Sequence, residues 1–178
     1  MNLANKLTLT RILLIPAFVY VLMSNIPNNV FIALVIFAVA SITDFLDGYV
    51  ARKYNMVSKL GKFMDPLADK LLVMAAFVCL VELGKASAWI VILILSREFI
   101  VSVFRAVAAS EGIVIAASKW GKYKTNSQIF AIIFILLQNY PFSLFTTLPV
   151  DQITLYIAAI LTVLSGFDYI WKNKNVLV

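Results

Sequence analysis

The sequence has no histidine and only one cysteine, so two common kinds of metal ligand are absent or nearly absent. Without histidine there is neither an imidazole metal site nor a histidine general base. Cys79 lies within an apolar run, and a single cysteine provides neither a disulfide framework nor a cysteine-based zinc site. Any metal site must therefore use oxygen ligands.

Charged residues are also scarce: they make up 13% of the 178 residues, whereas 62% are hydrophobic. An average soluble domain has about 25% charged residues, so the composition predicts an integral membrane protein. The net charge of +6 fits cytoplasmic loops near anionic lipid better than it fits a nucleic-acid-binding protein. We therefore expect a lipid bilayer as partner and no nucleic acid.

Six apolar segments are long enough to span a bilayer core, which takes about 20 helical residues. We expect them at about residues 9–26, 30–52, 66–84, 87–109, 126–142 and 152–171, after a short interfacial segment over residues 1–8. The breaks contain residues that disfavour a continued helix: Asn25 to Asn29, Gly84-Lys85, Gly121-Lys122 and Pro141 to Pro149. The prediction is an all-α, six-helix membrane bundle that forms one domain over residues 1–178.

Lysine and arginine set the expected orientation of this bundle. One set of helix ends carries Lys6, Arg11, Arg52, Lys53, Lys59, Lys62, Lys119, Lys122, Lys124, Lys172 and Lys174, whereas the other set has only Lys85. Because positively charged loops tend to stay in the cytoplasm, both termini are expected there.

Four of the nine acidic residues lie within or beside the apolar runs between residues 44 and 69: Asp44, Asp47, Asp65 and Asp69. The first two are spaced i, i+3 and the last two i, i+4, so each pair shares one helix face. The second segment enters from outside and the third starts from inside, which places both pairs at similar depth beneath the cytoplasmic surface. Two helices can thus present four carboxylates to one point.

Each pair also has a plainer interpretation. Asp65 precedes Pro66, and this combination commonly starts a helix, so Asp65 is expected to be an N-cap as well. That role leaves Asp69 unexplained. The first pair could instead neutralise Arg52 or Lys53, but carboxylates at membrane depth are costly and usually functional.

Four clustered carboxylates repel one another unless cations lie between them. An all-oxygen cluster suits Mg²⁺ or Mn²⁺, and two ions bridged by shared carboxylates suit phosphoryl transfer. Between the pairs, Gly48 and Ala51 keep a helix thin where a nucleotide must approach, and Gly61 lets the linker pass close by. Arg52 and Lys62 add positive charge for phosphate.

The pattern Asp44-x2-Asp47-Gly48-x2-Ala51-Arg52-x8-Gly61-x3-Asp65-x3-Asp69 resembles the complete signature of the CDP-alcohol phosphotransferase family. The resemblance implies a six-helix membrane enzyme, usually a homodimer, that transfers the phosphatidyl group of a CDP-linked lipid to an alcohol and releases CMP. It implies that the four aspartates bind two metal ions and that Asp69 is the base for the acceptor hydroxyl. The implied CDP-binding residues are Asn5, Thr8, Asp44, Asp47, Gly48, Ala51, Arg52 and Gly61.

Charged residues further along the chain indicate which alcohol could accept the phosphatidyl group. Arg97 and Arg105 are eight residues apart on one predicted helix, so both can face the same side, and Arg97 needs an interior partner such as Glu98. Gly121-Lys122 at a helix entry suggests an anion site. Two alternatives stay open: the Arg105 side chain could snorkel to the membrane surface, and the lysines around Lys122 could belong to an ordinary positively charged cytoplasmic loop. We expect Arg97, Arg105 and Lys122 to hold the phosphate of the acceptor.

The wider sequence resembles one branch of this family, the bacterial phosphatidylglycerophosphate synthases, at residues 2–11, 65–70, 96–100 with Arg105, and 121–125. This resemblance implies transfer from CDP-diacylglycerol to sn-glycerol 3-phosphate at the cytoplasmic face of a bacterial cell membrane. Alternative acceptors are inositol phosphate, and phosphatidylglycerol giving cardiolipin. A cation-coupled transporter would instead spread its charges through the membrane, with broken helices near the midplane. A catalytically silent subunit would not need the intact acidic set.

Overall fold

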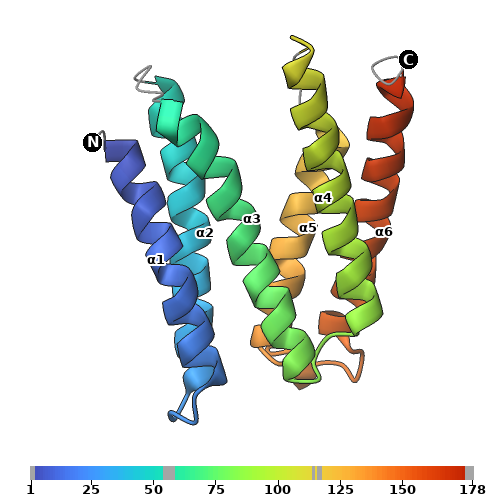
Figure 1. Cartoon of the computed structure of the whole chain (residues 1–178). Coiled ribbons are helices and arrows are strands. Elements are labelled where there is room, and N and C mark those ends of the chain that lie inside the picture. The colour runs from blue at the N-terminus through green and yellow to red at the C-terminus, as the bar shows by residue number, and fades with distance from the viewer. Residues whose placement is uncertain (1–2, 54–58, 114, 116–117, 175–178) are drawn as a thin grey trace. The chain divides into compact units, whose positions relative to one another are not determined.

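The computed structural model describes the backbone of residues 3–53, 59–113, 115 and 118–174. In these residues the chain forms six α-helices and one short 3-10 helix, with no β-strand. The helices are α1 (Leu3–Met23), α2 (Asn29–Lys53), α3 (Lys59–Glu82), α4 (Ala88–Ser110), α5 (Lys119–Leu136), η1 (Phe142–Leu144) and α6 (Val150–Lys172), as Figure 1 shows. They fall into two compact units, Met1–Glu82 and Leu83–Val178.

In the first unit, α1 packs against both α2 and α3, which also contact each other. Phe18 of α1 and Phe37 of α2 are fully buried, with ring centroids 5.9 Å apart. Asn29 closes the turn between these helices, because its Nδ2 donates to the carbonyl oxygens of Leu22 at 3.0 Å and Ser24 at 2.6 Å. Figure 1 shows that α1 begins, α2 ends and α3 begins at the same end of this unit.

In the second unit, α6 packs against both α4 and α5. Its buried face carries several small residues at helical spacing: Ala158, Ala159, Thr162, Ser165 and Gly166. Small side chains let neighbouring helices approach closely. A buried polar contact joins two of the helices, because Gln128 Nε2 of α5 donates to Thr162 Oγ1 of α6 at 3.0 Å. In Figure 1, α4 ends, α5 begins and α6 ends at the same end of this unit.

The all-α prediction and the six helices are confirmed in the described residues, but three helices begin earlier than expected. α1 begins at Leu3, so it is continuous with the predicted interfacial segment. α3 begins at Lys59, which makes the N-cap role of Asp65 wrong; residues 59–64 are mostly good helix formers and extend the helix before it. α5 begins at Lys119, where Ser118 Oγ accepts from Gly121 N at 3.0 Å and caps the helix. It ends at Leu136 and not near residue 142, because Gln138 and Asn139 have positive φ angles that a helix does not allow.

One described helix, α6, is long and apolar enough to cross a membrane by length and composition. Shorter apolar helical stretches occur at Thr8–Met23 and Asn29–Thr43. α4 is a continuous helix, but its apolar sequence is interrupted by three charged residues, Arg97, Glu98 and Arg105. A single candidate helix does not establish a six-span bundle, so the number of spans and the cytoplasmic termini stay predictions.

We predict that Thr162→Val lowers the free energy of unfolding by about 1–3 kcal/mol, because it leaves the buried Gln128 amide without its hydroxyl partner. Thermal unfolding in detergent would measure the loss. Thr154→Val is the control on the same helix, since the Thr154 hydroxyl donates within its own turn, to Asp151 O at 2.8 Å. Equal effects of the two substitutions would contradict a role for the contact between helices.

Candidate functional site

The four aspartates lie on α2 and α3, near the end of α2 and the beginning of α3. Asp47 lies six residues before Lys53, where α2 ends, and Asp65 lies six residues after Lys59, where α3 begins. Each is therefore about 9 Å along the axis from its helix end. Because the two ends lie together in the first unit (Figure 1), the two aspartate pairs lie at similar depth in its backbone.

The side chains of these aspartates lie outside the described residues. The same holds for other predicted CDP-binding residues, namely Asn5, Gly48, Ala51, Arg52 and Gly61. Among the side chains that the structure does describe, no group of three or more acidic or cysteine residues could hold a metal ion. Metal and CDP binding by the aspartate-bearing helices thus stays a prediction.

The polar face of α1 is buried in the first unit. Thr8 and Arg11 are each 1% exposed, and their i, i+3 spacing places them on one face of the helix. Thr8, a predicted CDP-binding residue, lies five positions after the start of α1 at Leu3. Both residues are thus near the end of the unit where α2 ends and α3 begins (Figure 1). The sequence pattern had placed Arg11 only among the cytoplasmic cations.

In the second unit, Glu98 of α4 is shared by two cations. Its Oε1 lies 3.4 Å from Arg97 Nη1 and also accepts a hydrogen bond from Lys124 Nζ of α5. The side chains are 12% exposed for Arg97, 14% for Glu98 and 7% for Lys124. The expected pairing of Arg97 with Glu98 is therefore confirmed. Charged groups this little exposed need such partners.

Lys124 belongs to this cluster although the sequence pattern did not select it. It is buried at positions i, i+4, i+7 and i+11 with Gln128, Ala131 and Ile135 of α5. That periodicity is the signal that could have identified it. Lys122, the residue predicted to bind phosphate, is exposed. Two positions along a helix turn a side chain by about 200°, so Lys122 and Lys124 point to nearly opposite sides of α5.

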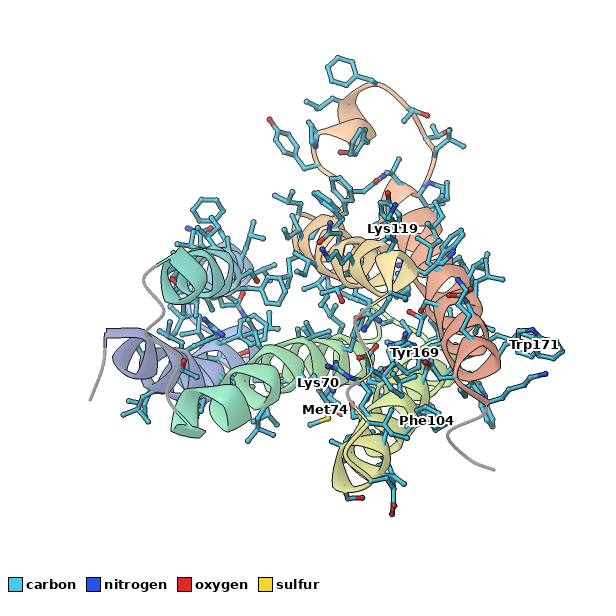
Figure 2. The ribbon with its side chains drawn as sticks, turned by 90° about the horizontal axis from the view of Figure 1, so that it is seen from above. Lys70, Met74, Phe104, Lys119, Tyr169 and Trp171 are labelled. Atoms are coloured by element: carbon cyan, nitrogen blue, oxygen red, sulfur yellow. The ribbon has the colours of Figure 1, made fainter. Side chains whose placement is uncertain are left out.

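The side chain of Arg97, which belongs to α4, packs against α6 at Gly166. A Cβ atom on Gly166 would lie 2.9 Å from Arg97 Cγ, so any larger residue there would displace the arginine stem. One turn further along α6, the ring of Tyr169 packs edge-on against Phe104, with centroids 6.0 Å apart and ring planes at 82°. Figure 2 shows Tyr169 lying beside Phe104, whereas Trp171 points away from the unit.

Tyr169 also lies within electrostatic reach of both predicted phosphate-binding arginines, Arg97 and Arg105. Tyr169 is 4% exposed, whereas Arg105 is exposed. The three cations Arg97, Arg105 and Lys124 with the single carboxylate of Glu98 give a formal charge of +2. Guanidinium groups in such an arrangement can bind a phosphate through paired hydrogen bonds.

We predict that Lys124→Met destabilises the protein by about 3 kcal/mol, because it removes one of two cations from the nearly buried Glu98 carboxylate. Lys122→Met should change stability by less than about 0.5 kcal/mol, since Lys122 is exposed. Chemical denaturation of the two variants in the same detergent gives the comparison. Equal stability of both variants would contradict the structural role of the pair.

Comparison with known proteins finds similarity along almost the whole chain. The family profile described as CDP-alcohol phosphatidyltransferase matches residues 1–164. A Bacillus subtilis protein named CDP-diacylglycerol–glycerol-3-phosphate 3-phosphatidyltransferase is 45% identical over 99% of this chain and 97% of its own length. Proteins with the same name from Rickettsia bellii and Haemophilus influenzae are 39% and 40% identical, each covering 96% of the relative and 98% or 99% of this chain. The chain therefore belongs to the CDP-alcohol phosphatidyltransferase family.

Proposed function

We propose that this enzyme transfers the phosphatidyl group of CDP-diacylglycerol to sn-glycerol 3-phosphate, which gives phosphatidylglycerophosphate and CMP. The observation that carries the proposal is full-length similarity to relatives named for this reaction. The acidic signature supports the donor chemistry. The cationic cluster of the second unit supports an acceptor that carries phosphate.

The donor is assigned to the first unit. The family is generally dependent on a divalent metal, and four carboxylates without histidine or cysteine form a donor set suited to Mg²⁺ or Mn²⁺. Asp44, Asp47, Asp65 and Asp69 would hold two such ions, which when bound neutralise the diphosphate of the donor. Gly48, Ala51, Arg52 and Gly61, with Asn5 and Thr8 of α1, would bind the CDP moiety.

Asp69 is assigned as the base of the transfer step. It takes the proton of the free terminal hydroxyl of glycerol 3-phosphate. The hydroxyl oxygen attacks the phosphorus that bears the diacylglycerol, and the bond from that phosphorus to the oxygen shared with the CMP phosphate breaks. CMP leaves with that oxygen, and the proton remains on the carboxyl group until it is lost to water.

The acceptor is assigned to the second unit, where Arg97, Arg105 and Lys122 are proposed to hold its phosphate; Lys122 is exposed and lies on the other side of α5 from Lys124. Arg97 and Arg105 are the better supported of the three. Both lie within electrostatic reach of the Tyr169 side chain, so the two arginines lie near the same place in the unit. The formal +2 charge of the cluster on α4 and α5 is matched by the charge of a phosphomonoester dianion. Free serine has no phosphate, and its single carboxylate would offset only one of the two net positive charges of the cluster.

The proposed setting is a bacterial cell membrane, with helices spanning the bilayer and the active site facing the cytoplasm. The apolar helix α6 and the distribution of lysine and arginine support this orientation. The proposal also includes a homodimer, which rests on the family resemblance alone.

A turnover assay with a panel of alcohols tests the acceptor. We expect CDP-diacylglycerol with glycerol 3-phosphate to yield phosphatidylglycerophosphate and CMP, with no product when EDTA is present and recovery on adding Mg²⁺ or Mn²⁺. Inositol phosphate, serine and phosphatidylglycerol should be much poorer acceptors. Preferred use of any of these three would overturn the acceptor but leave the transfer chemistry standing.

A substitution tests the base. Asp69→Asn should lower kcat by about 100-fold to 10,000-fold, because the amide cannot accept the hydroxyl proton. Glu82→Gln, near the far end of the same helix, is the matched control and should keep normal kcat. Near-normal turnover by purified Asp69→Asn protein would remove Asp69 from this role.

A further inference from the structure

Two hydrogen-bond donors in the second unit are buried without an acceptor. Arg97 Nε and the Tyr169 hydroxyl have no hydrogen-bond partner among the described residues. The arginine nitrogen can only donate, and the tyrosine hydroxyl can donate as well. Leaving buried donors unpaired is costly, so such groups call for an explanation.

The positions of both donors are fixed by their neighbours. Arg97 is held at one end by Glu98 and along its stem by the close approach to Gly166. Tyr169 is held by the edge-on contact of its ring with Phe104. The two residues lie within electrostatic reach of each other. Donors arranged in advance in this way suit an oxygen-rich anion.

We propose that Tyr169 is a further ligand of the acceptor phosphate and donates its hydroxyl hydrogen bond to the same phosphate as Arg97. Gly166 and Glu98 act as positioning residues for that arginine. The ligand class is a phosphomonoester dianion, because the surrounding cluster carries a formal charge of +2 and two buried donors, Arg97 Nε and the Tyr169 hydroxyl, lack an acceptor among the described residues. This inference rests on the proposed function and names a residue that the sequence pattern did not select.

Tyr169→Phe is the direct test, because it removes the hydroxyl and keeps the ring that packs on Phe104. We expect the KM for glycerol 3-phosphate and the Ki of inorganic phosphate to rise about tenfold, the loss expected for one hydrogen bond to a charged group. The KM for CDP-diacylglycerol should stay unchanged. The matched control is Tyr156→Phe on the same helix, where Tyr156 is 57% exposed and both constants should be normal.

An unchanged KM for glycerol 3-phosphate in Tyr169→Phe would overturn the inference. Equal increases in the KM values of both substrates would also overturn it, since they would indicate a structural role only. If the wild-type enzyme made no phosphatidylglycerophosphate, the proposed function itself would fall, so the two failures are distinguishable.

Gly166→Ala tests the same phosphate site from the arginine side and replaces the first variant if that protein does not fold. The added methyl group would displace Arg97, so the KM for glycerol 3-phosphate should rise at least threefold while the KM for CDP-diacylglycerol stays normal. In an Arg97→Ala background the same substitution should have no further effect, because its target is gone. Equal effects in both backgrounds, or no effect in either, would overturn the positioning role.

Discussion

Charged side chains on apolar helices need partners, and this need organises the whole molecule. A charge in surroundings with little water is tolerated when an opposite charge or an ion compensates it. In the second unit the compensation is visible, because Glu98 pairs with both Arg97 and Lys124. In the first unit the four aspartates lie on α2 and α3, and carboxylates gathered at one point repel one another unless cations lie between them. Metal ions are the compensation that we propose there.

The acidic and the basic side chains have different parts in the proposed reaction. Carboxylates on α2 and α3 suit divalent ions and hence a diphosphate donor. Guanidinium and ammonium groups on α4 and α5 suit a phosphate acceptor. Glu98 keeps part of the positive charge neutralised within the protein itself, so the cluster does not depend on a ligand for all of its stabilisation.

Much of the fold could be predicted from the sequence, because each apolar segment supplies most of one α-helix, and the breaks at residues 25–28, Gly84-Lys85 and Pro141 to Pro149 separate α-helices. Gly121-Lys122 instead lies within α5. The starts of α3 and α5 were harder, since polar first turns extend a helix beyond its apolar part. Placing the start of α5 too late also concealed Lys124. Gly166 and Tyr169 could not be selected, because their roles depend on where Arg97 crosses α6, and spacing along one chain does not reveal such a crossing.

In the proposed reaction, the acceptor hydroxyl attacks the phosphorus bearing the diacylglycerol. An oxygen-18 label in the terminal hydroxyl of glycerol 3-phosphate tests it most directly, with both products analysed by mass spectrometry. The proposed chemistry predicts that the label appears in the new phosphodiester bridge of phosphatidylglycerophosphate and that CMP stays unlabelled. Label in CMP, or a lipid product without label, would contradict it.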